Sequence, residues 1–374
     1  MSPDERRMSA PPWPSHGGQS AALLQRYGLP PGHSLEDFSA NLNPLGPPAW
    51  VAEALGRQVD ALCHYPAPDY WPAREALAAH HGVAPEQVLL TNGGAEAIFL
   101  AAALHAGKRA GVLTPSFGEY ARACRAHGLS MTPIALPAPG FALDLEVLMV
   151  ALRKIDVLFL CRPNNPTATL IPLEQMHRLL ACAAACGCQV VVDEAFIHLA
   201  PGQGEEASLA PLLAENPHMV LLHSLTKFYT LPGLRLGHVL ADISTIDALA
   251  ACQPAWSVNR MAAELVAPLL ADTAFAGQTR AWLESEHPPM ATALAQTGLE
   301  VVPSTTSFFL VRPGHTLRER GLVSDVLFER LLRGGMLVRH THNFPGLDGG
   351  WLRIALRDRA ANQRLLKVFN DCVC

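Results

Sequence analysis

The chain has few charged residues and lacks long basic or apolar runs. Only 16% of its 374 residues are Asp, Glu, Lys or Arg, and the formal net charge is −5. Domains that bind nucleic acid are usually basic, so no nucleic-acid partner is expected. Gly, Pro or a charge interrupts every apolar stretch before ~18 residues, so no transmembrane helix and no membrane partner are expected.

The N-terminal residues 1–15 lack the apolar core of a signal peptide. They combine acidic and basic residues with several prolines. We interpret this segment as a disordered lead and expect the protein to be cytoplasmic.

The nine cysteines form no regular framework. Their odd number and uneven spacing argue against a set of disulfides. Cys182, Cys186 and Cys188 cluster in an alanine-rich, helix-like stretch, but no second ligand cluster of convincing spacing accompanies them. His340 and His342 alternate near a strand end and are weak evidence alone. No metal is therefore expected.

Apolar residues make up 49% of the chain, enough for two domains with a substantial core. The residues at 157–160 and 190–192 are apolar on both faces, which is typical of strands covered by helices on two sides. Alternating patterns predict strands at 88–91, 111–114, 156–161, 189–192 and 219–223. They predict helices at 49–61, 74–81, 95–106, 117–127 and 173–186.

The pattern changes near residue 254. Two long helices, 258–270 and 273–286, are followed by short strands at 299–302, 307–311, 336–339 and 352–355. Helices are predicted at 324–332 and 362–369. We expect a lead and arm at 1–45, a large α/β domain with a mostly parallel sheet at 46–254, and a smaller α+β domain at 255–374.

Lys227 is the most informative residue, because a lysine amine can form an imine with an aldehyde. The hydroxyls of Ser224 and Thr226 and the guanidinium of Arg235 lie close to it in sequence and are suited to a phosphate. An aldehyde that carries a phosphate is pyridoxal 5′-phosphate (PLP), the predicted cofactor.

Two polar side chains follow predicted strands. Asp193 comes directly after Val192, and a carboxylate in that place is costly unless it is paired. A protonated pyridine nitrogen would be a suitable partner; a helix cap or an arginine pair is the alternative. Asn165 could donate to a ring oxygen, although Asn-Pro is also ordinary turn chemistry.

Two further segments join strands to helices. Gly93, Gly94 and Ala95 would let backbone N–H groups approach an anion at a helix N-terminus. Phe117 could stack on a cofactor ring or belong to the core.

Arg339 and Arg353 end and begin apolar strands, where guanidinium groups need anionic partners. Arginine binds carboxylate and phosphate through two parallel hydrogen bonds. The pair suggests a substrate that carries two anions, and a structural salt bridge for either arginine is the alternative.

Four motifs in order resemble the fold-type I, class I/II aminotransferase family. They are Asn164-Asn165-Pro166-Thr167, Asp193-Glu194-Ala195-Phe196, Ser224-Leu225-Thr226-Lys227 and Gly233-Leu234-Arg235-Leu236-Gly237. The resemblance runs from about His16 to the C-terminus. It implies a mostly parallel seven-stranded sheet in the large domain, and a homodimer with a shared active site.

The resemblance also implies roles for matching residues. Lys227 and Asp193 would be catalytic, Lys227 holding the cofactor and Asp193 pairing with the pyridine nitrogen. The other cofactor-binding residues would be Gly93, Gly94, Ala95, Phe117, Asn165, Ser224, Thr226, Arg235 and, from the second subunit, Tyr65. The substrate would be bound by Arg353 (carboxylate), by Arg339 with His16 and Asn41 (phosphate), and by Asn165.

Within the family, the chain resembles two enzymes in particular: threonine-phosphate decarboxylase of cobalamin biosynthesis and histidinol-phosphate aminotransferase. The stretches from His16, Phe38 and Tyr65, together with Phe196 and Asn343, favour the decarboxylase. A phosphorylated amino acid is thus the expected substrate, and the aminotransferase is the alternative. A non-catalytic PLP-binding regulator is a remote third reading, because no DNA-binding segment accompanies the fold here.

Three features depart from the family pattern. The Gly93-Gly94-Ala95 turn lacks the side-chain hydroxyl often found there, which leaves fewer donors for a phosphate. Arg162 stands where a neutral residue is more usual. Ala168 replaces the glycine that normally follows Asn-Pro-Thr, so the loop is expected to differ.

Overall fold

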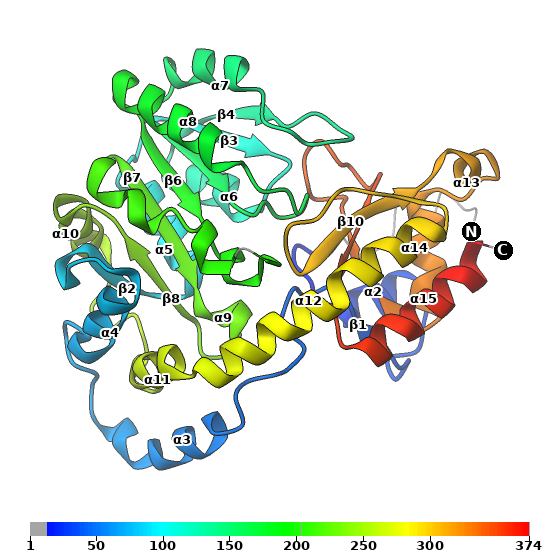
Figure 1. The fold of residues 1–374 in the computed structure, drawn as a ribbon, viewed down its shortest axis with the longest axis horizontal. Helices are drawn as coiled ribbons and strands as arrows, with labels where there is room; N and C mark the ends of the chain where they lie inside the picture. The colour runs from blue at the N-terminus through cyan, green and yellow to red at the C-terminus, as the bar shows by residue number, and fades with distance from the viewer. Residues whose placement is uncertain (1–12, 203, 374) are drawn as a thin grey trace. The chain divides into compact units, whose positions relative to one another are not determined.

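The computed structural model describes residues 13–202 and 204–373. Their contacts form two compact units (Figure 1). The larger unit contains Leu42–Glu284 and Thr305–Ser307. The smaller contains the segment up to Asn41, Ser285–Ser304, and the chain from Phe308 onward. The three-part division at residues 45 and 254 stays a prediction.

A seven-stranded sheet forms the centre of the larger unit. All neighbouring strands are parallel except β8, which is antiparallel to both β2 and β7. The sheet confirms the predicted fold class. In spatial order the strands are β2 (Val88–Asn92), β8 (Leu236–Leu240), β7 (Met219–Ser224), β6 (Gln189–Asp193), β5 (Val157–Cys161), β3 (Arg109–Thr114) and β4 (Ser130–Ala135).

Helices cover both faces of this sheet, which explains why its central strands are apolar throughout. Side chains of α5 (Gly93–Ala103), α6 (Glu119–Ala126) and α10 (Ile243–Cys252) share one core with alternate strand residues such as Val191 and Leu222. The helix α8 (Leu173–Cys186) lies over the opposite face (Figure 1).

The remaining helices of the larger unit are shorter or lie at its edge. They are α3 (Val51–Arg57), α4 (Trp71–His81), α7 (Leu145–Leu152), α9 (Leu225–Phe228) and α11 (Arg260–Ala271). The long helix α12 (Thr273–Gln296) begins in this unit and continues into the smaller one.

The smaller unit has a four-stranded antiparallel sheet. Its order is β12 (Arg339–His340), β13 (Leu352–Ala355), β10 (Phe308–Pro313) and β9 (Leu299–Val301). A separate parallel pair joins β1 (Glu36–Asp37) to β11 (Met336–Leu337). The helices are α2 (Ser20–Arg26), α13 (His315–Glu319), α14 (Ser324–Arg333) and α15 (Arg359–Val373).

The single strand predicted at 336–339 was wrong. The chain divides there into β11 and β12, which pair with different strands. Among the described residues, no helix combines the length and apolarity that crossing a membrane needs.

Candidate active site

Lys227 lies in the single turn α9, which follows β7 without an intervening loop. Its side chain is half-buried. Two hydrogen bonds from Asn43 fix this turn: its backbone N–H donates to the Lys227 carbonyl over 3.2 Å, and its Nδ2 donates to the Phe228 carbonyl over 2.9 Å. The amine therefore projects from a constrained turn at the end of a central strand.

Asp193 is the last residue of β6 and is buried. One carboxylate oxygen accepts a 2.7 Å hydrogen bond from the Tyr120 hydroxyl, and the other accepts one of 2.9 Å from the Ala195 N–H. Burial raises the pKa of Asp193, while these hydrogen bonds and the Lys227 charge lower it. Asp193 ends β6 and Lys227 follows the end of the parallel neighbour β7, so both groups lie at the same edge of the sheet.

The predicted phosphate-binding residues meet at the start of α5. Gly93 has φ +74°, and a Cβ built there would lie 2.7 Å from Arg235 Nη2. A Cβ on Gly237 would lie 2.9 Å from the Gly93 carbonyl carbon and 3.0 Å from the Gly94 nitrogen. Only glycine permits both approaches, so the guanidinium of Arg235 lies directly against the Gly93 backbone.

Ser224 and Thr226 border the same region and are buried. Thr226 Oγ1 donates to the Leu236 carbonyl over 3.3 Å, which links the Lys227 turn to β8. Ala95 follows Gly94 in the first turn of α5, where backbone N–H groups have no intrahelical acceptor. The structure thus brings together the hydroxyls, the guanidinium and the helix N-terminus.

Asn165 and Phe117 come from loops that follow β5 and β3. Asn165 is buried, and its neighbour Asn164 holds the loop by donating to the Pro115 carbonyl over 3.0 Å. Phe117 is half-buried and meets Tyr120 edge-to-face with ring centroids 6.0 Å apart. The structure leaves the stacking role of Phe117 a prediction.

Two of the departures from the family pattern, Arg162 and Ala168, have structural partners. Arg162 is buried, lies 3.5 Å from Glu194, and donates from Nε to the Ile171 carbonyl over 2.9 Å. Ala168 adopts φ +63°, a conformation in which glycine is less strained. Its carbonyl accepts two 2.8 Å hydrogen bonds from Thr305, which hold the loop in this shape.

Tyr65 is exposed. Three quarters of its surface is accessible, and its ring stacks on Trp256 with centroids 4.5 Å apart. The Arg260 guanidinium donates to its carbonyl over 3.3 Å. The ring therefore lies on the surface of the larger unit.

In the smaller unit, Arg339 and Arg353 face each other on β12 and β13. Both are buried. Arg339 donates to the Ser15 carbonyl over 2.8 Å and to Asn343 Oδ1 over 2.7 Å. Arg353 donates to the Ser39 carbonyl over 2.6 Å.

The two guanidinium groups are costly to keep charged. Burial lowers the pKa of Arg339 to about 10. Burial also lowers the pKa of Arg353 to about 9; the Arg339 charge contributes to this, and Asp37 opposes it. Two facing cations in a buried place favour an anionic ligand.

Asn41 and His16 belong to the same unit. Neither amide atom of Asn41 has a hydrogen-bond partner among the described residues, although the side chain is buried. His16 is exposed and precedes Gly17, where any Cβ would overlap the Ser39 carbonyl. The N-terminal segment therefore packs against the loop that carries Asn41, and Ser15 contacts Arg339.

The residues of the larger unit fit PLP. Asp193 is a buried carboxylate that needs a cationic partner, Lys227 is a nearby amine, and the Gly93–Arg235 contact places a cation at a helix N-terminus. Tyr120, which orients Asp193, was not predicted from the sequence. Its only local signal is its place in the first turn of the helix that follows Phe117.

The family model for aminotransferase class I and II matches residues 34–369. A curated threonine-phosphate decarboxylase from Salmonella typhimurium (strain LT2) is 37% identical over 360 residues, 96% of each chain. A histidinol-phosphate aminotransferase from Anaeromyxobacter sp. (strain Fw109-5) is 34% identical over 337 residues, 88% of each chain.

A solved structure of L-threonine-O-3-phosphate decarboxylase from Porphyromonas gingivalis is similar in fold. Its TM-score is 0.77 at 28% identity, over 89% of this chain and 98% of the other. The family model matches most of the chain, and the mostly parallel sheet with the lysine turn at its edge agrees with that match. The chain belongs to the class I and II aminotransferase family.

Proposed function

We propose that this chain is a PLP-dependent decarboxylase. It converts L-threonine O-3-phosphate to (R)-1-amino-2-propanol O-2-phosphate, a step of cobalamin biosynthesis. The observation that carries this proposal is the 37% identity to a threonine-phosphate decarboxylase across 96% of both chains.

PLP supplies an aldehyde for amine exchange and a cationic ring that takes up the electron pair of the bond broken at the substrate Cα. Asp193 would pair with the pyridine nitrogen and keep it protonated, because a buried carboxylate is stabilised by a cation beside it. Tyr120 holds that carboxylate in place through its 2.7 Å hydrogen bond. Asn165 would donate a hydrogen bond to the ring hydroxyl.

Lys227 would supply a proton to Cα. When the substrate carboxylate leaves as carbon dioxide, Cα must take up one proton in its place. The side chain of Lys227, in its protonated ammonium form and on a turn held by the Asn43 hydrogen bonds, would donate that proton as a general acid and then take up another from solvent. In transamination the same amine would instead remove the Cα proton.

The two facing arginines select the substrate. Arg353 takes the carboxylate, and Arg339 takes the phosphate with help from Asn41 and His16. This assignment is supported by the burial of both guanidinium groups and by the buried Asn41 amide that lacks a protein partner among the described residues. A substrate with two anions neutralises both cations.

The test is product analysis with purified holoenzyme. We expect carbon dioxide and aminopropanol phosphate from L-threonine O-3-phosphate, at a rate far above that with unphosphorylated L-threonine. Absence of carbon dioxide release from the phosphorylated substrate would contradict the proposal.

Histidinol-phosphate aminotransferase is the second candidate, because a relative of that name is 34% identical over 88% of both chains. The same holoenzyme is therefore incubated with histidinol phosphate and 2-oxoglutarate. Formation of glutamate without carbon dioxide release in the first assay favours this candidate.

We also propose a cytoplasmic homodimer. The segment around Tyr65 exposes several large apolar side chains, which suits a subunit interface. They are Leu45, Val59, Leu62, Tyr65 and Trp71, with Trp256 stacked on Tyr65.

Sedimentation measures the mass of the assembly in solution. Mixing inactive Lys227→Ala with Tyr65→Ala chains tests sharing: regained activity requires one intact site built from two subunits.

A further inference from the structure

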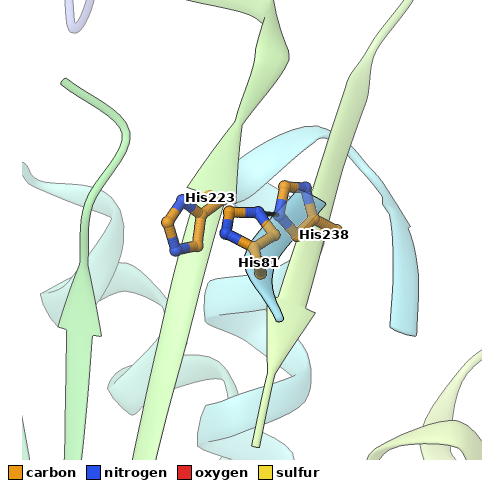
Figure 2. A group of neighbouring side chains, drawn as sticks. All are labelled: His81, His223 and His238. Carbon is orange, nitrogen blue, oxygen red and sulfur yellow. Dashed lines mark hydrogen bonds between the residues drawn. The ribbon is translucent and has the colours of Figure 1, made fainter. Parts of the chain in front are cut away.

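A cluster of histidines lies on the face of the large sheet opposite Asp193. His223 on β7 and His238 on β8 are register partners, and their neighbours Leu222 and Val239 belong to the core on the other face. His81 ends helix α4. Figure 2 shows the three rings gathered side by side, although they come from distant parts of the sequence.

Two of these imidazoles are fully buried and neutral. Burial lowers the pKa of both His223 and His238 well below the usual value, and the other histidines of the cluster add to this effect. Neutral imidazole is the form that binds a metal ion.

Several ring nitrogens of the cluster lack partners. Within the described residues, neither ring nitrogen of His223 has a hydrogen-bond partner, and Nδ1 of His238 has none. Leaving such a group buried and unsatisfied is unfavourable. A cation bound by His223 would satisfy one of its two ring nitrogens.

The spacing suits a metal ion. One nitrogen from each of His81, His223 and His238 lies within 4.8 Å of the other two, and the Nε2 atoms of His81 and His238 are 2.9 Å apart. Zinc–nitrogen bonds of about 2.0–2.1 Å place tetrahedral ligand atoms about 3.3 Å apart. Ring movements of about an ångström give that spacing. The proton in the hydrogen bond between His81 Nε2 and His238 Nε2 then moves to Nδ1 of the same ring, which leaves both Nε2 atoms free for the metal.

Glu194 adds a carboxylate beside the cluster. Its Oε2 lies 3.5 Å from His223 Nε2, and Arg162 lies 3.5 Å from its Oε1. A carboxylate that contacts a ligand imidazole fixes the ring orientation and raises its basicity. Arg162 limits the surplus negative charge on this side.

We propose that His81, His223 and His238 bind a divalent transition metal ion of the class that imidazole prefers, with Zn²⁺ as its representative. The ion joins the end of α4 to β7 and β8. The next residue on β7 is Ser224, and the residue before His238 is Gly237. The site therefore links β7 and β8 on the opposite face of the sheet, next to the strand ends that carry the Lys227 turn and Arg235.

The test measures metal binding directly. Untagged holoenzyme is dialysed against a chelator, incubated with Zn²⁺, desalted and analysed for metal by mass spectrometry. We expect one retained ion per chain in the wild type and in His80→Gln. His81→Gln should lose it, because His80 adjoins the cluster on the same helix end without contributing one of the three converging nitrogens. His81 is half-buried, so its replacement should not unfold the chain.

Co²⁺ provides a second measurement that needs no variant. Cobalt bound by imidazoles in wild-type holoenzyme should show the d–d absorption of a low-coordinate nitrogen site, without the sulfur charge-transfer band that the cysteines would give. The proposal is overturned if the wild type and His81→Gln retain Zn²⁺ equally, or if His80→Gln loses it as His81→Gln does. The absence of a cobalt spectrum also overturns it.

Discussion

The lysine turn of the larger unit and the arginine pair of the smaller unit are built in different ways. Around Lys227, the backbone does most of the positioning: Gly93 and Gly237 permit close approaches, and Arg235 adopts φ +59°. Around Arg339 and Arg353, buried guanidinium groups donate to carbonyls and to Asn343. The first region is suited to one invariant cofactor, whereas the second can be changed side chain by side chain to suit different substrates.

If this comparison is correct, the largest effect comes from removing the amine of the first region. Lys227→Ala should lower decarboxylation at least about a thousand-fold, because both cofactor attachment and proton transfer are lost. Carbon dioxide release measures the rate. Borohydride should fix the cofactor to the wild type and to the exposed-lysine control Lys154→Ala, but not to Lys227→Ala; fixation in that variant would place the attachment elsewhere.

The arginine pair should affect selectivity without affecting the cofactor. Arg339→Gln should lower kcat/KM for L-threonine O-3-phosphate by about a hundred-fold, since a buried charge-assisted contact to phosphate is lost. The rate with unphosphorylated L-threonine should barely change.

Arg364→Gln is the matched control for the arginine prediction, because Arg364 forms an exposed ion pair with Glu36. The visible spectrum of bound cofactor should be the same in all three proteins. An equal loss with both substrates would assign Arg339 a structural role.

A backbone substitution separates the two regions further. Gly93→Ala forces a Cβ against the Arg235 guanidinium at a residue with φ +74°. We expect the Kd for PLP to rise about ten-fold, in line with roughly 1–2 kcal/mol of strain. Gly118→Ala is the control, because its Cβ would meet nothing within 4 Å. Equilibrium dialysis measures the Kd for PLP of both variants. Equal Kd values would mean that Gly93 does not help to bind the cofactor phosphate.

The last expected effect is a pH dependence of stability, which does not involve the cofactor or the substrate. The folded-state pKa values of His223 and His238 lie below their unfolded values. Below about pH 6.5 the unfolded chain therefore binds more protons, and the free energy of unfolding falls as the pH falls. The limiting slope is about 1.4 kcal/mol per pH unit for each histidine.

Urea melts with chelator present at pH 7.5, 6.5 and 5.5 measure this slope. His238→Gln should flatten it, since one of the two groups is gone. An unchanged slope would mean that other groups cause the loss of stability at low pH. The arginine pair should contribute nothing here, because both arginines remain charged throughout this range.

Local signals in the sequence located much of the fold. Apolar runs predicted β5, β6 and β7 to within a residue at each end, since strands buried on both faces are continuously apolar. The patterns did not locate β4 or β8. β4 is largely exposed, and β8 contains His238 and Gly237, which interrupt its apolar pattern.

The sequence by itself determined the cofactor chemistry of this protein, because Lys227 and Asp193 stand in motifs that follow strands and must meet at one sheet edge, and Arg235 lies only eight residues beyond Lys227. Tertiary structure alone decided what has no local signal: Tyr120 on Asp193, Arg339 opposite Arg353, and three histidines from α4, β7 and β8 in one cluster. Those contacts join residues far apart in the chain. Strand order and helix packing create them, and no spacing along the sequence records either.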